Sequence, residues 1–96
     1  MNEKTIYIAG KISNNPTFQE DFSKAVQSLK DKGYKHIVNP CCISCLDLKY
    51  EQYLSITFAM IDISDAVYFL SNWKESDGAK REYLYATSKQ KEILYE

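Results

Sequence analysis

Hydrophobic positions along the chain alternate between short runs typical of buried strands and longer segments with helical spacing. Runs rich in β-branched and aromatic residues predict four strands, at 5–10, 36–40, 65–70 and 92–96. Apolar residues at three- and four-residue intervals predict three helices, at 18–32, at 49–64 and from about Ala79 onward. Strands and helices therefore alternate along the whole chain.

The predicted first helix has signals at both ends. Thr17 is a reasonable N-cap, and Glu20 lies three residues further on, which is the spacing of a capping box. Gly33 follows the last apolar position and is typical of a residue that ends a helix.

Alternation of strands and helices predicts an α/β fold, with a mainly parallel sheet of four to five strands between two helical layers. We expect a single domain over residues 1–96, a three-layer sandwich of the Rossmann-like or flavodoxin-like kind. Ligands in such sheets bind beyond the carboxyl ends of the strands. Three polar segments fall on that edge, namely GKISNNP, NPCC and SNWKESDG.

The composition is that of an ordinary globular domain, with 45% hydrophobic and 26% charged residues. A net charge of -1 and the lack of a basic run argue against a protein that binds nucleic acid polymers. The longest apolar stretch, near residues 66–70, is too short to cross a bilayer. The N-terminal segment has no apolar core of a signal peptide. We therefore expect a cytoplasmic protein without membrane contact.

The three cysteines lie together in the segment PCCISC, at Cys41, Cys42 and Cys45. The last two form a lone CxxC, and the single histidine, His36, leaves too few ligands for a closed zinc site. A redox CxxC normally caps a helix after a strand, which the position after HIVNP allows. We favour reduced cysteines packed in or near a loop, and expect no metal.

The segment SDGAKRE, residues 76–82, contains the residues best suited to chemistry. Ser76 offers a hydroxyl, and Gly78 lets a ligand approach the backbone at a helix start, where N–H groups and the dipole favour an anion. Glu82 lies about one turn further on, where a carboxylate can act as nucleophile or base on a bound sugar. The same residues also fit a plain turn and a solvated glutamate.

Several motifs occur in one order along nearly the whole chain: IYIAGKIS, GY…IVNP, Y..Y, SDAVYFL, W.ESDGA..E and EIL. This order resembles the nucleoside 2-deoxyribosyltransferase-like superfamily. It is most similar to a short branch often found in phages and bacteria, the domain-of-unknown-function 4406 family. The relatives with known chemistry are nucleoside 2-deoxyribosyltransferases and 2'-deoxynucleoside 5'-phosphate N-hydrolases. They cleave the N-glycosidic bond through a glutamate that attacks C1' of the sugar, and the resemblance implies no metal or organic cofactor.

In this resemblance, Glu82 matches the nucleophilic glutamate, which lies six residues after a position that contacts the sugar. That position is an aspartate meeting the 5'-hydroxyl in the transferases and a serine meeting the 5'-phosphate in the N-hydrolases. Here it is Ser76, which implies a nucleotide with a 5'-phosphate. Gly78 matches the glycine between them. The N–H groups near Gly78 and Ala79 are expected to hold the phosphate.

Two residues of the first strand and its loop complete the match. Tyr7 and Gly10 correspond to the tyrosine and glycine that border the sugar and the glutamate in the relatives. The resemblance therefore implies that Tyr7 holds Glu82 or the sugar, and that Gly10 lies beside the bound substrate.

One position departs from the relatives. They carry an aspartate about eight residues before the one that matches Asp65, and it acts as an acid towards the leaving base or helps orient the sugar. Asp65 is a candidate binding residue, and it also suits a turn between helix and strand. In this sequence, the position about eight residues before Asp65 is Thr57. Threonine does not donate a proton with the ease of a carboxylic acid. Asp62 is off the helical register of Thr57 and is no obvious substitute.

Two functions are therefore open. The first is an enzyme that cleaves the N-glycosidic bond of a 2'-deoxynucleoside 5'-monophosphate, by hydrolysis or deoxyribosyl transfer. The second is a non-catalytic module that senses or sequesters a nucleotide or a nucleotide-derived signal. The spacing of Ser76, Gly78 and Glu82 favours the first, and Thr57 favours the second.

The aromatic content indicates self-association. The chain has eight tyrosines, and Tyr50, Tyr53 and Phe58 are predicted to lie along one helix. Tyrosine is common at interfaces because it has an apolar body and a polar tip. We expect a homodimer or a higher homo-oligomer, with the covering of the sheet as the alternative role of these residues.

Overall fold

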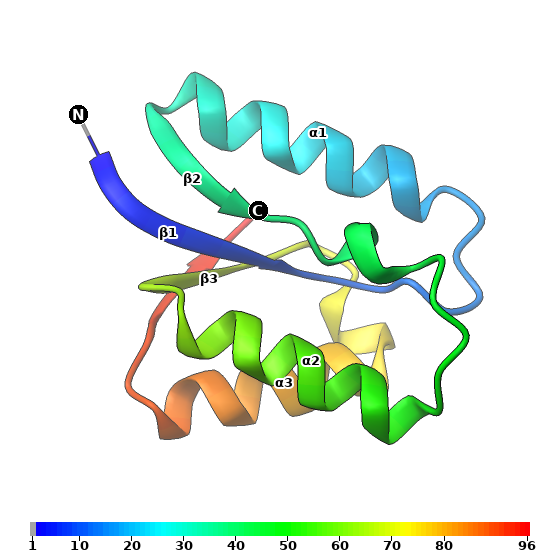
Figure 1. Cartoon of the computed structure of the whole chain (residues 1–96). Coiled ribbons are helices and arrows are strands. Elements are labelled where there is room, and N and C mark those ends of the chain that lie inside the picture. Colours follow the sequence, from blue (N-terminus) through cyan, green and yellow to red (C-terminus); the bar gives the residue numbers. More distant parts are fainter. Residues whose placement is uncertain (1) are drawn as a thin grey trace.

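The computed structural model describes residues 2–96, which form an α/β sandwich of three layers (Figure 1). The strands are β1 (Asn2–Ala9), β2 (Tyr34–Val38), β3 (Ala66–Phe69) and β4 (Glu92–Tyr95). The α-helices are α1 (Phe18–Asp31), α2 (Tyr50–Asp62) and α3 (Asp77–Ser88). Two short 3-10 helices, η1 (Pro40–Ile43) and η2 (Trp73–Glu75), follow β2 and β3.

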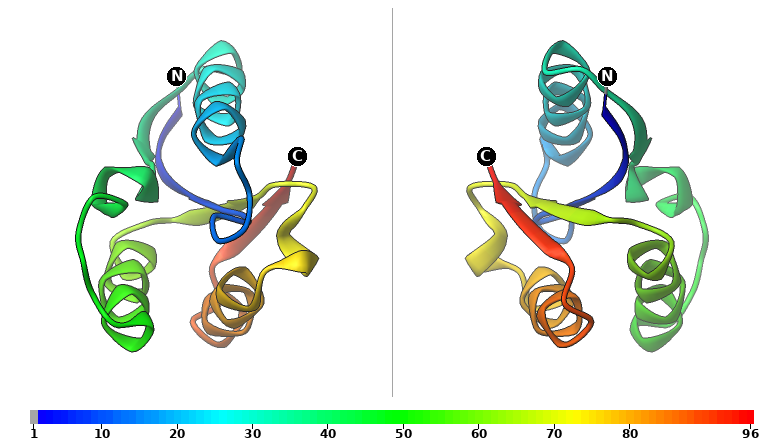
Figure 2. Two further views of the ribbon diagram at one scale, coloured as in Figure 1. Left: turned by 90° about the vertical axis from the view of Figure 1, so that its right-hand side faces the viewer. Right: turned by 90° about the vertical axis from the view of Figure 1, so that its left-hand side faces the viewer.

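The sheet is parallel throughout, with the strand order β2-β1-β3-β4. Helix α1 covers one face, while α2 and α3 cover the other, as the end-on views in Figure 2 show. This arrangement confirms the predicted three-layer α/β fold and its parallel sheet, with four strands in the described part of the chain. Because all four strands run the same way, their carboxyl ends meet at one edge.

Alternating side chains of the two central strands supply both cores. Ile6 and Ile8 of β1 face α1, where they pack with Phe22 and Leu29. Residues between them in the sequence point the opposite way, so Tyr7 and Ala9 belong to the core beneath α2 and α3. Strand β3 is buried on both faces, as expected for a central strand of a parallel sheet.

The start of α1 differs from the predicted capping box. Thr17 has φ -105° and ψ 17°, which is not the extended conformation of an N-cap that accepts hydrogen bonds, and its side chain does not cap the helix. Its hydroxyl lies 3.1 Å from Oδ1 of Asn15 instead. The side-chain amide of Asn15 donates to Asp21 in the first turn and to the carbonyl of Lys11. Asn15 therefore ties the loop after β1 to the helix.

The third helix begins two residues earlier than predicted, at Asp77. Ser76 is its N-cap, with an extended backbone (φ -119°, ψ 121°) and a hydroxyl that accepts the N–H of Ala79 at 3.1 Å. The serine therefore fixes the helix start, because its side chain satisfies one of the N–H groups that have no partner within the helix.

Gly10 is required by packing where β1 leaves the sheet. A Cβ at this position would lie 2.6 Å from Cδ1 and 3.0 Å from Cβ of Leu70, which is itself buried. We expect Gly10→Ala to lower the free energy of unfolding by about 1–3 kcal/mol, because β3 or the following loop must shift. Chemical denaturation measures this change.

Gly78→Ala is the matched control for that substitution. The nearest atom to an added Cβ at Gly78 is the hydroxyl oxygen of Tyr50 at 3.6 Å, an ordinary contact. Alanine is also a better helix former than glycine. Equal losses of stability in the two variants would contradict the packing role of Gly10.

Candidate active site

A pocket of about 810 Å³ opens at the carboxyl edge of the sheet. Its walls come from the loop after β1, from η1 and the first half of α2, and from η2 and the first turns of α3. Six of the seven predicted site residues line it, namely Tyr7, Gly10, Ser76, Gly78, Ala79 and Glu82. The tertiary structure thus brings three distant segments to the edge that the strand order predicts.

Glu82 and Tyr7 form a buried pair at the base of the pocket. The hydroxyl of Tyr7 donates to Oε2 of Glu82 at 2.7 Å, across 75 residues of sequence. Glu82 is 6% exposed and Tyr7 is 1% exposed. Helix α3 places Glu82 on the same buried stripe as Ala79 and Ala86, which are small enough to let the helix lie close to the sheet. The alternative of a solvated glutamate is therefore wrong.

Burial dominates the electrostatics of this pair. Removal from water raises the pKa of Glu82 to about 7, although the hydroxyl groups of Tyr7 and Thr57 act in the opposite direction. Burial, followed by the neighbouring carboxylate of Glu82, raises the pKa of Tyr7 well above its ordinary value. Tyr7 is therefore a permanent donor, whereas Glu82 changes its charge near neutral pH.

Thr57 lies beside the pair, on the wall formed by α2. It is 8% exposed, and its hydroxyl donates to the carbonyl of Leu54 at 3.2 Å. The nearby hydroxyl also acts to lower the pKa of Glu82. Thr57, at the position where the resemblance leads one to expect an aspartate, thus lines the pocket with an alcohol.

The start of α3 offers a site for an anion, with one change from the expected donors. Because Ser76 already occupies the N–H of Ala79, that group is not available to hold a phosphate. The N–H groups of Asp77 and Gly78 lie in the first turn, where a helix leaves them without an internal partner. The hydroxyl of Ser76 accepts one bond and still has its own proton to donate.

Lys11 is a pocket residue that the sequence interpretation missed. It follows Gly10 in the loop after β1, and its side chain is 26% exposed. Its Nζ lies 3.7 Å from Oε1 of Glu75 in η2, and its backbone N–H donates to Oδ1 of Asn72 at 3.1 Å. These contacts join the loops after β1 and β3. The sequence signal was the position of the lysine in a polar segment predicted at the ligand edge.

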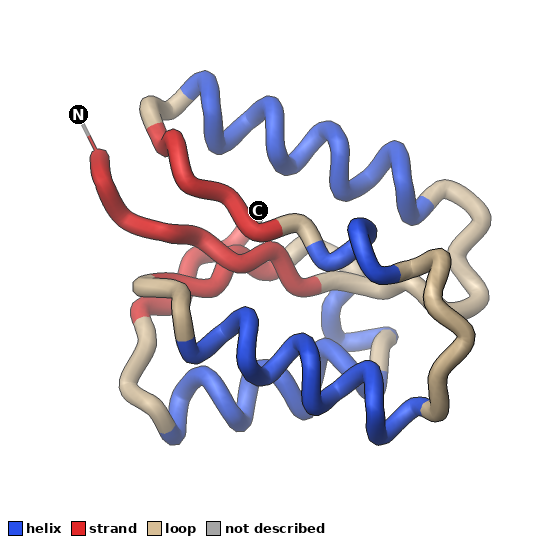
Figure 3. Tube along the Cα trace, in the orientation of Figure 1, coloured by secondary structure: helices blue, strands red, loops and turns tan. Residues whose placement is uncertain are grey.

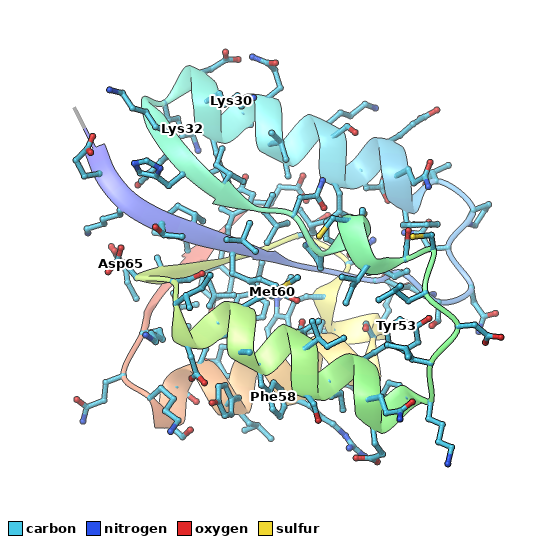
Figure 4. All side chains as sticks on the ribbon, viewed as in Figure 1. Lys30, Lys32, Tyr53, Phe58, Met60 and Asp65 are labelled. Atoms are coloured by element: carbon cyan, nitrogen blue, oxygen red, sulfur yellow. The ribbon has the colours of Figure 1, made fainter. Side chains whose placement is uncertain are left out.

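The aromatic residues of α2 do not share one face. Tyr50 and Tyr53 line the pocket, and the hydroxyl of Tyr53 is held by the backbone of Leu46 and Leu48. Phe58 lies about two turns along α2 and stacks on Tyr85 of α3 with ring centres 4.2 Å apart. Figure 4 labels Tyr53 near the start of α2 and Phe58 further along it.

Asp65 is not brought to the pocket. It precedes β3 at the opposite edge of the sheet, where its Oδ2 accepts the N–H of Thr5 at 2.8 Å and its own N–H donates to the carbonyl of Thr5. Figure 4 shows it far from Tyr53, which lies at the pocket end. Asp65 was predicted to bind the ligand, but it lies away from the pocket. Its hydrogen bonds fit the alternative, a residue at the turn between helix and strand.

The cysteines belong to η1 and the loop that follows it, shown beside the second strand in Figure 3. Cys41 is half-buried, Cys42 and Cys45 are exposed, and all three are free thiols. Burial raises the pKa of the Cys41 thiol to about 11, which disfavours a reactive thiolate. Within residues 2–96, no group of three or more His, Cys, Asp or Glu residues is placed to hold a metal ion. No helix in that range is long and apolar enough to cross a membrane.

Comparisons with known proteins agree with this architecture. A family model described as "Domain of unknown function (DUF4406)" matches residues 4–95. The structure is similar to that of "2-desoxiribosyltransferase from Leishmania mexicana", with a TM-score of 0.70 and 25% sequence identity. The similarity covers 96% of this chain and 63% of the transferase chain, so this chain spans less than two thirds of the length of that protein. No curated protein matches the sequence.

Proposed function

Because the chain belongs to the DUF4406 family and has the fold of a nucleoside 2-deoxyribosyltransferase-like protein, we propose that it cleaves the N-glycosidic bond of a 2'-deoxynucleoside 5'-monophosphate. An oxygen of Glu82 attacks C1' as the bond from C1' to the base breaks, which leaves a glycosyl ester on the enzyme. Water, or a second base, then attacks C1' and releases Glu82 as a carboxylate. The first outcome is hydrolysis and the second is deoxyribosyl transfer.

The buried pair of Glu82 and Tyr7 is the observation that supports this proposal most directly. The sheltered position of this carboxyl group keeps competing water away from the reacting carbon. The bond from Tyr7, at 2.7 Å, fixes Oε2 and leaves Oε1 as the attacking atom. Glu82 also lines the pocket, so a bound sugar can reach its carboxyl group.

The phosphate is proposed to lie at the start of α3. Ser76 donates its hydroxyl proton, and the N–H groups of Asp77 and Gly78 point along the helix axis with the positive end of the dipole. Lys11 supplies the one cationic side chain in the described lining of the pocket. An oxygen of the phosphate would take the place of Glu75 beside the lysine.

The test is incubation of the purified protein with each common 2'-deoxynucleoside 5'-monophosphate, followed by chromatography for free base. We expect release of base from at least one of them. A protein that binds these nucleotides and releases no base from any would contradict the enzyme.

Ser76 should select for the 5'-phosphate. We expect Ser76→Asp to weaken binding of deoxynucleoside monophosphates by about 10-fold or more, because a carboxylate at the N-cap repels the phosphate, and to affect deoxynucleosides far less. Aspartate still caps the helix, so the fold is retained. Calorimetry with matched nucleoside and nucleotide pairs measures the difference. Equal binding of both ligands by the wild-type protein would show that the phosphate site is wrong.

A non-catalytic nucleotide-binding module is the second candidate, and one observation favours it. The wall beside Glu82 carries the hydroxyl of Thr57 where a proton donor for the leaving base is expected. In this case the pocket binds the nucleotide as a signal, and Glu82 accepts a hydrogen bond from a sugar hydroxyl.

Self-association remains a prediction, and we propose one surface for it. A groove of about 440 Å³ runs between α2 and α3, beside the stacked pair of Phe58 and Tyr85. Leu84 projects there with 68% of its surface exposed. We expect sedimentation to give at least twice the 11.1 kDa mass of the chain, and Leu84→Lys to weaken the assembly. A monomer mass at micromolar concentration would contradict this.

A further inference from the structure

The acids that line the pocket limit which bases it can release, if the proposed function is correct. When the bond to C1' breaks, its electron pair stays on the nitrogen of the base. A neutral purine or pyrimidine would leave as an anion unless an acid protonates it, and such an acid accelerates a reaction by about 10²–10⁴-fold.

Three carboxyl groups line the pocket in the described part of the chain, at Glu75, Asp77 and Glu82. Glu82 is used as the nucleophile. Glu75 and Asp77 flank Ser76 at the start of α3, on the side proposed for the phosphate, and their side chains are 68% and 89% exposed. Each lies within 4 Å of a lysine Nζ, at 3.7 and 3.6 Å. Neither is buried against the base, as an acid for the leaving group would need to be.

The wall formed by η1 and α2 is the one left for the base, and none of its described lining residues is charged. Its polar side chains are Ser44, Tyr50, Tyr53 and Thr57. The hydroxyl of Tyr53 is held by backbone groups, and that of Thr57 donates to the carbonyl of Leu54. Alcohols and phenols are weak acids beside a carboxylic acid. This wall can hold a ring by contact and stacking, but it contributes no strong proton donor.

We propose that the preferred substrates are nucleotides whose base is already a cation, such as N7-alkylated purine deoxynucleotides or pyridinium mononucleotides. As the bond from Glu82 to C1' forms, the bond to the base breaks and its electron pair neutralises the ring. The base therefore leaves neutral without taking up a proton. Water then adds to C1', Glu82 leaves as a carboxylate, and the proton passes to solvent.

The charges around the pocket suit a cationic ring. Glu75 and Asp77 each lie beside a lysine, so an ionised Glu82 is the negative charge that faces the proposed site of the base. The guanidinium of Arg81 already lies 5.4 Å from the ring centre of Tyr50. The ring of Tyr53, which lines the same pocket, is therefore the one proposed to lie against a cationic base.

The test compares two nucleotides with the same sugar and phosphate, dGMP and its N7-methyl derivative. Rates are corrected with Glu82→Gln, since the methylated base also leaves slowly in water. We expect kcat/KM to be higher for the methylated nucleotide by about 100-fold or more. Thr57→Asp, which introduces a carboxylic acid beside the base, should reduce this ratio by about 10-fold or more. Thr57→Asn has a similar shape without an acidic proton and should leave the ratio high.

The outcomes separate this inference from the proposed function. Cleavage of dGMP within about threefold of its methylated form, with a ratio that Thr57→Asp does not change, would overturn the inference and leave the glycosidase intact. Binding of both nucleotides without Glu82-dependent loss of either base would overturn both.

Discussion

Replacement of Glu82 by glutamine is expected to reduce the release of base by about 10³-fold or more, with the affinity for nucleotide changed only a few-fold. Glutamine has nearly the same shape and can still accept the bond from Tyr7, so the pocket keeps its form. What it lacks is a nucleophilic oxygen that can form the ester to C1'. Base release measured by chromatography and binding measured by calorimetry separate the two effects. Retention of the wild-type rate would eliminate Glu82 as the nucleophile.

Tyr7→Phe serves as the companion to that variant. Loss of the hydroxyl removes a bond that lowers the pKa of Glu82, so the pKa of about 7 should rise further. Base release by the wild-type protein should increase as pH rises through about 7, because the carboxylate is the reactive form. In Tyr7→Phe the same rise should occur at higher pH, with a smaller loss of maximal rate than in Glu82→Gln. An unchanged pH profile would mean that Tyr7 does not act on the charge of Glu82.

Glu82 should also make the protein less stable as the pH rises. Its pKa is about 7 in the folded state and about 4.5 when unfolded, so folding favours the neutral form. The stabilisation is complete below the unfolded pKa and is lost as pH rises through about 7. Glu82→Gln cannot ionise. The difference in free energy of unfolding between Glu82→Gln and the wild type should therefore shift in favour of the variant by about 2–3 kcal/mol as the pH rises from about 5 to about 8.

Urea denaturation of both proteins at the two pH values provides the measurement. The comparison between variants cancels the titration of the other carboxylates, which both chains share. Parallel pH dependence of the two proteins would show that Glu82 is already ionised in the folded state. The expected result means that ionisation of the buried Glu82, which the attack requires, makes the folded protein less stable. Such a loss of stability is common at active sites.

Much of the architecture could be predicted from local sequence patterns. The short β-branched runs and the helical spacing between them gave the element order, and chain chirality then favours a parallel sheet with its ligand edge at the strand ends. The spacing from Ser76 to Glu82 placed the serine ahead of a helix start and the glutamate about one turn inside the helix. These features depend on residues close together in the sequence, where backbone geometry alone sets the distances.

The helix boundaries and two residue roles were not predictable in this way. Thr17 failed as a cap because the loop after β1 is held by Asn15, and Asp65 faces the opposite edge because its partner is Thr5. In each case the deciding hydrogen bond joins residues whose relative position depends on the fold of the loop or the sheet. Lys11 lies in a polar segment predicted at the ligand edge, but only the packing of the loops places this particular residue in the pocket.

The sequence by itself determined which residue types could perform the chemistry, namely a glutamate, a tyrosine and a serine ahead of a helix. Only the tertiary structure decided that Glu82 is buried against Tyr7, 75 residues away, and that no charged group in the described lining faces it from η1 and α2. Burial depends on all the elements packed around a side chain, and the pKa of a carboxyl group depends on burial more than on its sequence neighbours. The charge state of Glu82 is therefore a property of the folded chain.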